Sequence, residues 1–366
     1  MSRGIFKSGK FWIGILISAV FLYFAFRNID FRALAKVFLK INPWWVAAGV
    51  GLYYVNLGVR AIRWQYIYRH VKKVSFWGMF GATVVGYFAN NVLPMRLGEV
   101  ARAVYIGEKE GTDKSASLGT IAVERIFDGI LAMIVLGMTF VLFELPPEVV
   151  GQWKMYFRRA GEAFAAVSLI GLLIMMVMVR QRDWTLRVID RIVSPMPEKF
   201  RAVTQRLAFS FIDGLKILSS PLEVFVLLLL SAAVWGTNLF PLYCMGSAFG
   251  VKGMQFGFAD MLFVLTAGSV AAAIPASPGF VGTFHYATKL AISIILTVKF
   301  NNGGFHAVGI KPELFGEWGL SYAIVTHALY ILTTTITGAI WVIVSGVSFS
   351  KLRGGTEPPG DGEATK

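Results

Sequence analysis

The stretch that decides the fold is NNVLPMRLGEVARAVY, residues 90–105, which overlaps the end of an apolar run that begins at residue 74. It combines two helix breakers with three charged side chains: Pro94, Gly98, Arg96, Glu99 and Arg102. Proline removes a backbone donor and glycine weakens a helix, so we do not expect a straight helix to pass through this stretch. The sequence therefore predicts that the chain turns back at this point.

The composition is that of a chain that lies mostly inside a lipid bilayer. Of its 366 residues, 56% are hydrophobic and only 15% are charged, against about 25% charged residues in soluble domains. The mean hydropathy is +0.63. Because backbone polar groups in lipid must be bonded within the spanning structure, apolar runs of this length predict helices. We expect an all-α, polytopic helical membrane protein.

Other classes of function are disfavoured by what the sequence lacks. The net charge of +14 could indicate nucleic acid binding, but the basic residues bracket hydrophobic runs, as cytoplasmic membrane flanks do. The single cysteine, Cys244, excludes an internal disulfide. We find no phosphate-binding glycine loop, metal-ligand cluster or nucleophile motif, so we expect no nucleic acid, metal or cofactor, and an enzyme is the less favoured class.

Apolar runs, uncharged except for Glu124, Arg125 and Asp128 in the fourth, predict about six to eight spans, the first an uncleaved N-terminal span. The runs are 11–26, 41–59, 74–95, 119–143, 163–179, 224–251, 261–288 and 318–350. A helix needs about 20 mostly apolar residues to cross a bilayer. Residues 1–350 are expected to form one transmembrane domain, followed by a disordered cytoplasmic tail at 351–366.

The distribution of basic residues predicts the orientation of the spans. The N-terminus, residues 60–73, residues 180–216 and the tail are basic, so we place all four in the cytoplasm of a bacterial-type cell, with the spans in its cytoplasmic (inner) membrane. If every apolar run crossed the membrane once, the basic segment 180–216 would lie outside. It lies in the cytoplasm if 76–105 is a re-entrant hairpin that does not cross. The basic loop 27–40 disagrees, unless residues 28–42 form an interfacial amphipathic helix.

A second break resembles the first. LPMRLGEV (93–100) and IPASPGFV (274–281) share an aliphatic residue, proline, a later glycine and a final valine. Chance in a chain rich in Gly and Ala is one explanation, and an inverted repeat with two facing broken segments is the other. The second break contains Pro275, Pro278, Gly279 and Gly282. Residues 258–297 would be either a re-entrant hairpin or two crossings broken at Pro275.

The charged residues near the first break are candidate binding residues. Arg96, Glu99, Arg102, Glu124, Arg125 and Asp128 would each cost at least about 2.5–3.5 kcal/mol in hydrocarbon unless they pair or meet water. One interpretation is an ion-pair network that locks the hairpin to the next span. The other is a lipid headgroup site, because the arginine fork matches phosphate oxygens.

Three further polar residues lie beside the breaks. Asn90 and Asn91 would satisfy backbone groups freed at the first break or contact substrate, and His285 would be a structural residue or a ligand. His327 is a weaker candidate of the same kind. Trp64 is expected to be an interfacial anchor, as tryptophan often is.

Three motifs resemble those of one family. LPMRLGEVARA, VERIFD (123–128) and IPASPGFVGTF are similar in order and spacing to segments of the flippase-like, lysylphosphatidylglycerol synthetase transmembrane-region family, over roughly residues 10–345. The resemblance implies an integral inner-membrane protein with re-entrant segments around a lipid-accessible cavity. It carries over the following residues: Arg96, Glu99, Arg102, Glu124, Arg125, Asp128, Pro278, Gly279 and Gly282.

The chain departs from this family at two positions of the second break. Many members have glutamate where His285 stands, and many have a second glycine where Phe280 stands. The charge that the second break would contribute to a headgroup site, and so the type of headgroup that the site would bind, is therefore not decided by the resemblance. The family's aminoacyl-transferase domain is not expected in this chain, so lysyl transfer is not inherited.

The favoured hypothesis is a flippase that moves a lipid with a polar headgroup, an anionic or isoprenoid phospholipid, across the cytoplasmic membrane. The alternative is a membrane enzyme or accessory subunit in envelope lipid or glycolipid biosynthesis. An envelope-biosynthesis enzyme and a second copy of the chain are the protein partners considered.

Overall fold

A computed structural model describes most of the chain. It covers residues 16, 19–20, 22–26, 29–39, 41–93, 97–143, 147–195, 197–249, 256–273, 278–302 and 311–346. The predictions on Pro94, Arg96, Pro275 and the tail 351–366 lie outside the described residues, as does most of the predicted first span, 11–26.

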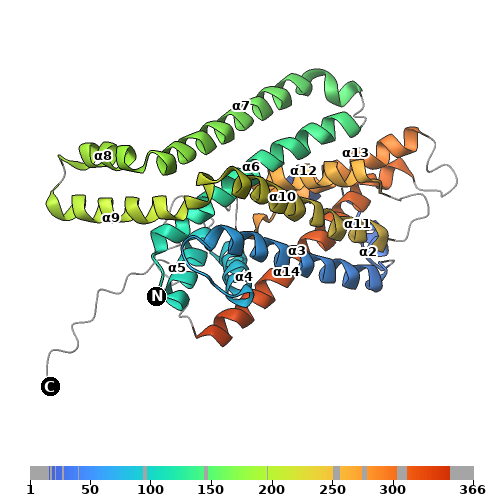
Figure 1. Cartoon of the computed structure of the whole chain (residues 1–366). Helices are drawn as coiled ribbons and strands as arrows, with labels where there is room; N and C mark the ends of the chain where they lie inside the picture. Colours follow the sequence, from blue (N-terminus) through green and yellow to red (C-terminus); the bar gives the residue numbers. More distant parts are fainter. Residues whose placement is uncertain are drawn as a thin grey trace.

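The described residues form helices and no strand, which confirms the all-α prediction (Figure 1). The helices are α2 (Phe31–Phe38), α3 (Pro43–Tyr68), α4 (Phe76–Val92), α5 (Gly98–Glu110), α6 (Lys114–Leu142), α7 (Pro147–Arg180), α8 (Arg182–Val193), α9 (Glu198–Gly214), α10 (Pro221–Thr237), α11 (Leu239–Ala248), α12 (Phe258–Ala273), α13 (Thr283–Asn301) and α14 (Phe315–Ser345), with the short turns η2 (Lys216–Ser219), η3 (Pro278–Phe280) and η4 (Pro312–Leu314). By length and composition, four described stretches could cross a membrane: Pro43–Tyr68, Pro221–Ala248, Pro278–Asn301 and Pro312–Ser345. The chain is a multi-pass membrane protein.

Helices α4 and α5 form the first hairpin. Gly98 lies against the neighbouring helix so closely that a Cβ there would be 2.3 Å from the carbonyl oxygen of Gly86. At the open end of the hairpin, Lys72 before α4 donates to the carbonyl oxygen of Glu110 at the end of α5. Both ends of the hairpin therefore lie on the same side of the bundle, and the predicted turn-back is confirmed.

Helices α12 and α13 form a second hairpin, joined by η3. Lys299 at the end of α13 contacts Asp260 at the start of α12, with 2.9 Å between Nζ and Oδ2. Further along, a Cβ on Gly268 would lie 3.1 Å from the ring of Phe284. The two ends of this segment thus also lie together, as either a re-entrant hairpin or two crossings broken near Pro275 requires.

Helix α14 runs antiparallel to α4 of the first hairpin and to α13 of the second, and so relates the two hairpins to each other. Its first residue, Phe315, accepts a hydrogen bond from Ser293 of α13, and its middle residue His327 contacts Gly279 at the second tip. Beyond that point, Thr334 accepts from Asn91 near the first tip, and α14 also contacts the rest of α4. The two tips therefore approach the middle of α14 from opposite ends, as an inverted repeat requires.

We call the two ends of the bundle the basic end and the distal end. At the basic end, Tyr68 of α3 bonds Thr112 before α6, with 2.6 Å between the oxygens, and Arg69 pairs with Glu223 of α10. Helix α9 packs against the start of α6, which brings the basic segment 180–216 to this end as the parity of crossings predicted. Figure 1 shows α8 and α9 side by side, extending away from the other helices.

At the distal end, the amide of Asn42 before α3 donates to the carbonyl oxygen of Ala248 of α11, at 2.7 Å. Phe143 after α6 stacks on Phe263 of α12. Helix α2, expected as part of an interfacial amphipathic helix at 28–42, packs here against the start of α14. The opening of the second hairpin lies at this end, opposite to the opening of the first.

Candidate functional site

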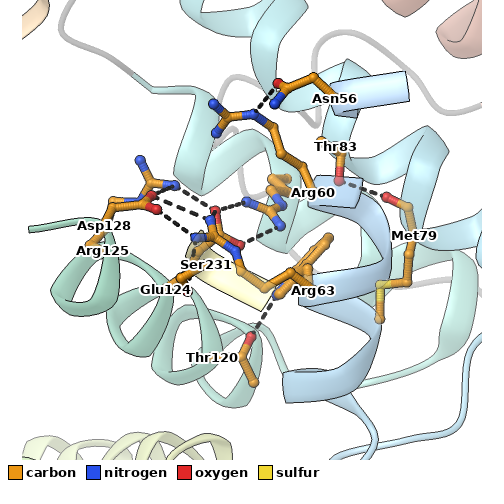
Figure 2. A network of polar contacts seen from close by, with 12 residues as sticks. Asn56, Arg60, Arg63, Met79, Thr83, Thr120, Glu124, Arg125, Asp128 and Ser231 are labelled. Carbon is orange, nitrogen blue, oxygen red and sulfur yellow. Dashed lines mark hydrogen bonds and ion pairs between the residues drawn. The ribbon is translucent and has the colours of Figure 1, made fainter. Parts of the chain in front are cut away.

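The charged site is built around Arg63 of α3, whose side chain is fully buried. Its guanidinium contacts both oxygens of Asp128, at 2.5 and 3.3 Å, and lies 3.2 Å from an oxygen of Glu124. It also donates to the hydroxyl of Ser231 on α10 at 3.3 Å. Arg63 therefore ties α3 to α6 and α10 (Figure 2). The two carboxylates stand four residues apart, which places them on one face of α6.

Arg102 attaches the first hairpin to this centre. Its two terminal nitrogens donate to the two oxygens of Glu124 at 3.0 and 2.8 Å, a bidentate geometry that strengthens a charge-assisted bond. Its guanidinium also lies 3.5 Å from the ring centroid of Trp64. Trp64 is fully buried and donates to Thr120, so the expectation that it is an interfacial anchor is wrong. The indole instead covers a charge that would otherwise face hydrocarbon.

Arg125 is the most accessible member of the cluster. Its side chain is 45% exposed, although it contacts Glu124 and lies 3.0 Å from Asp128. The ion-pair cluster therefore contains three arginines, Arg63, Arg102 and Arg125, against two carboxylates, and carries one excess positive charge.

Arg60 adds a second positive charge beside the cluster. It lies one turn before Arg63 on α3, donates to Asn56 at 2.9 Å and lies 5.8 Å from the ring centroid of Tyr87 (Figure 2). Among the described residues no carboxylate lies within ion-pair distance of Arg60. A half-buried guanidinium without a carboxylate partner attracts an anion, because desolvating it is otherwise costly.

A cavity of about 210 Å³ lies between the two hairpin tips. Its described lining is Tyr53, Tyr87, Asn91, Asn238, Leu242, Val264, Leu265, Gly268, Ser269, Ala272, Gly279, Phe280, Phe284, His327, Tyr330, Ile331 and Thr334. This lining is mostly apolar with several hydroxyls and amides, and it contains no carboxylate. Tyr87 connects the cavity to the charged cluster, since it faces Arg60 and interacts electrostatically with Arg125.

The structure separates the roles of the two asparagines. Asn90 accepts a hydrogen bond from the amide of Gly98 at 2.8 Å, so it closes the first tip. Asn91 donates to the hydroxyls of Thr334 and Thr335 and lines the cavity. Glu99 is half-buried and interacts electrostatically with Arg125, but it has no carboxylate–cation contact within ion-pair distance among the described residues.

The predicted glycines and histidine of the second break lie together at its tip. Gly279 and Gly282 have φ angles of 70° and 94°, which glycine adopts without a Cβ clash. Phe280 between them has a φ of 58°, a conformation that is rare for a bulky residue. His285 contacts the amide of Gly282 and the ring of His327. Pro278 begins η3, next to the cavity residue Gly279.

Sequence reasoning missed Arg60 and Arg63, because they were assigned to the basic loop that follows the second run. The signal that could have found them is their spacing. Both recur at a helical interval from Asn56 on one face, and α3 needs about 20 residues to cross, which extends it beyond Arg60. No group of three or more His, Cys, Asp or Glu side chains among the described residues is placed to hold a metal ion.

Comparison with known proteins agrees with this geometry. Residues 11–301 match the family described as the lysylphosphatidylglycerol synthase transmembrane region. The chain belongs to this family. It is also 27% identical over 133 residues to "Glycosyltransferase AglD" of Haloferax volcanii, which covers 34% of this chain and 21% of that protein. The match thus spans about a fifth of the length of this curated relative, and no solved structure was found to match the chain.

Proposed function

We propose that this member of the family moves a phosphate-bearing lipid headgroup across the membrane through the cavity between the hairpin tips. The observation that supports this most strongly is the pair of hairpins that approach α14 from opposite ends around a partly polar cavity. Irregular backbone at membrane depth is tolerated where it is buried in protein or lines a wet cavity. A headgroup would cross between the tips while its acyl or isoprenoid tails stay in the lipid.

The charges favour an anionic headgroup. Tyr87 lines the cavity, and Arg60 lies 5.8 Å from its ring centroid. Arg125 interacts electrostatically with Tyr87, and both arginines are at least partly accessible. An arginine fork offers two parallel donors to phosphate oxygens. A cationic headgroup would find no carboxylate in the described lining, and the excess positive charge nearby would repel it.

Arg63 and Arg102 have a different role in this proposal. Their terminal nitrogens are held by Glu124 and Asp128, so they would fix the position of Arg125 rather than bind the headgroup themselves. The two interpretations of the charged residues are therefore complementary, since the same network locks the hairpin and orients the accessible arginine.

The basic end would face the cytoplasm. Arg69, Lys72 and Lys73 follow α3, and the segment 180–216 has eight basic residues against four acidic ones. Basic residues near span ends favour the cytoplasmic side. The first hairpin would then enter from the cytoplasm and the second from the opposite side, with the protein in the cytoplasmic membrane of the cell.

The test is lipid movement in proteoliposomes that contain a headgroup-labelled anionic phospholipid. An Arg60→Gln, Arg125→Gln double variant should slow the movement at least tenfold, whereas an Arg187→Gln, Arg191→Gln control on the exposed surface of α8 should not. An Arg96→Ala, Glu99→Ala variant tests the remaining residues predicted from the sequence. Wild-type rates in the Arg60, Arg125 variant would remove this pair from the mechanism, and absence of movement by the wild-type chain would reject translocation.

A second candidate is a role in glycolipid biosynthesis, as an enzyme or as the membrane subunit of one. The similarity to a protein named as a glycosyltransferase favours it, although the match covers only a fifth of that protein. Formation of a glycosylated lipid by the purified chain, or recovery of a stoichiometric enzyme partner with no lipid movement by the chain alone, would support this candidate instead.

A further inference from the structure

The tip of the second hairpin is closed by a chain of hydrogen bonds through two histidines. The amide of Gly282 contacts Nδ1 of His285 at 3.3 Å, Nε2 of His285 lies 3.4 Å from Nδ1 of His327, and Nε2 of His327 lies 2.7 Å from the carbonyl oxygen of Gly279. His285 lies on α13 and His327 on α14, so this series of hydrogen bonds also joins these two helices.

The positions of the hydrogens in this series of bonds follow from the groups at its two ends, the amide of Gly282 and the carbonyl oxygen of Gly279. The carbonyl oxygen of Gly279 can only accept, so His327 must carry a hydrogen on Nε2, and a neutral ring then leaves its Nδ1 as an acceptor. His285 must therefore donate from Nε2, which leaves its own Nδ1 to accept from the amide of Gly282. With both rings neutral, every ring nitrogen has a matched partner.

One added proton would break this match. The accessible acceptor is Nδ1 of His285, because His285 is half-buried whereas His327 is only 5% exposed. A proton on that nitrogen would turn it into a donor. It would then face the N–H of Gly282, another donor, with no acceptor between them. The bond it replaces is already long at 3.3 Å, so little holds the amide in place afterwards.

The backbone at Gly282 is ready to move when that bond is lost. Its φ of 94° and ψ of −65° lie near the γ-turn conformation, and glycine can leave this conformation for others without a Cβ clash. Such conformations persist when the surrounding contacts hold them. The contact from Gly282 to His285 is one of those that close the start of α13, together with the bond from the amide of Tyr286 to the carbonyl oxygen of Gly282.

We propose that His285 and His327 form a binding site for a single proton, and that occupancy of this site opens the tip of the second hairpin beside the cavity. His327 and Gly279 both line the cavity, so opening of the tip would change the shape of the cavity. The effect on lipid movement rests on the proposed function, but proton binding and tip opening do not.

The surroundings leave the pair free to respond to pH. On α13, Lys289 lies one turn from His285, but its Nζ donates to the carbonyl oxygen of Ala25 and interacts electrostatically with Glu317 of α14. On α12, Asp260 is paired with Lys299 at the distal opening.

The groups nearest the pair are aromatic. On α14 and α4, Tyr330 and Tyr87 line the same cavity, and the ring of Phe284 stacks on His327. No carboxylate on the described parts of these helices contacts either imidazole to hold a proton at neutral pH.

The test uses the full chain in detergent or nanodiscs and two measurements that do not depend on transport. Nitrogen NMR of the histidine rings should show the Nε2–H tautomer for both His285 and His327 at about pH 7.5, and one imidazolium at the acidic end of the titration. Hydrogen exchange at the Gly282 amide should become about tenfold faster on acidification, after correction for the intrinsic rate. The Gly98 amide, which bonds Asn90 at the first tip, is the internal control and should not change.

Variants separate this site from other effects of pH. In His285→Gln the side chain still offers an acceptor and a donor but does not titrate, so Gly282 exchange should be slow at both pH values. His70→Gln, a control at the basic end, should keep the wild-type response. The proposal fails if wild-type Gly282 exchange does not respond to pH, if His285→Gln responds as the wild type does, or if NMR finds both rings in the same state throughout.

A transport measurement then relates the site to the proposed function. Acidification should speed lipid movement by the wild-type chain and not by His285→Gln. A chain that moves no lipid at any pH, yet shows the exchange and NMR changes, would retain the proton site and reject the proposed function.

Discussion

The close crossing of α4 and α5 gives a sharp prediction, because a single methyl group at Gly98 should disrupt it. A Cβ at this position would lie 2.3 Å from the carbonyl oxygen of Gly86 and 2.4 Å from the side chain of Asn90. Backbone and a bonded amide surround the site, so no flexible side chain can simply move aside. Separation of the two helices by about 1 Å is needed to restore van der Waals contact.

The expected loss follows from these contacts. Overpacking costs about 1–3 kcal/mol, and Gly98→Ala should lie at the upper end because its neighbours are backbone atoms. Alanine gains up to about 1 kcal/mol of helix propensity over glycine, which leaves a net destabilisation of about 2 kcal/mol. Gly98 does not have a positive φ, so the change isolates the steric effect.

Gly137 of α6 is the matched control, since a Cβ there would meet nothing within 4 Å. Thermal unfolding of detergent-solubilised variants, followed by loss of the monodisperse fraction, should place the Tm of Gly98→Ala lower by about 4–8 °C. Gly137→Ala should unfold at the wild-type temperature or slightly above it. A Gly98→Ala variant as stable as Gly137→Ala would refute the close crossing.

Three further predictions test other parts of the structure. Arg63→Met should lower the free energy of unfolding by about 3–5 kcal/mol because it leaves buried carboxylates without their partner. Arg69→Met at the exposed basic end should change it by less than about 1 kcal/mol. Chemical unfolding measures both, and equal losses would contradict the burial of Arg63. Phe280→Gly should raise the Tm, since it relieves a backbone conformation that costs about 1–2 kcal/mol in a bulky residue. A lower Tm would mean that packing of the aromatic ring stabilises the protein by more than this conformation destabilises it. A double-mutant cycle with Asp260→Asn and Lys299→Met should give a coupling energy of about 0.5–3 kcal/mol, and no coupling would argue against contact between the two ends of the second hairpin.

Local patterns were enough to predict both hairpins. Pro94 and Gly98 mark the first turn, and the parity of basic segments required that turn to return the chain to its starting side. The second hairpin, containing Pro278 and Gly279, followed from similarity to the first, although crossing parity could not exclude two spans. Contact between Asp260 and Lys299 shows that the two ends of the segment lie together, which both arrangements require.

The centre of the charged cluster was not predictable from local patterns, because Arg63 and Trp64 look like the end of a span. A charge and an indole near the end of an apolar run normally meet the membrane surface. Here both are buried, since carboxylates on α6, three helices further along the chain, reach the same depth. The contact of His285 with His327 likewise depends on how α13 packs against α14, which neither residue's neighbours in sequence reveal.

The most direct test of the account asks whether the two hairpins open on opposite sides of the membrane. Four exposed positions mark their ends, Ser75 and Gly111 for the first, Gly257 and Asn302 for the second. Each is changed to cysteine in turn, and an impermeant thiol reagent is applied to one side of sealed vesicles; the natural Cys244 is buried and serves as background. The account predicts that positions 75 and 111 react from one side and positions 257 and 302 from the other. Reaction of positions 75 and 111 from opposite sides would contradict it.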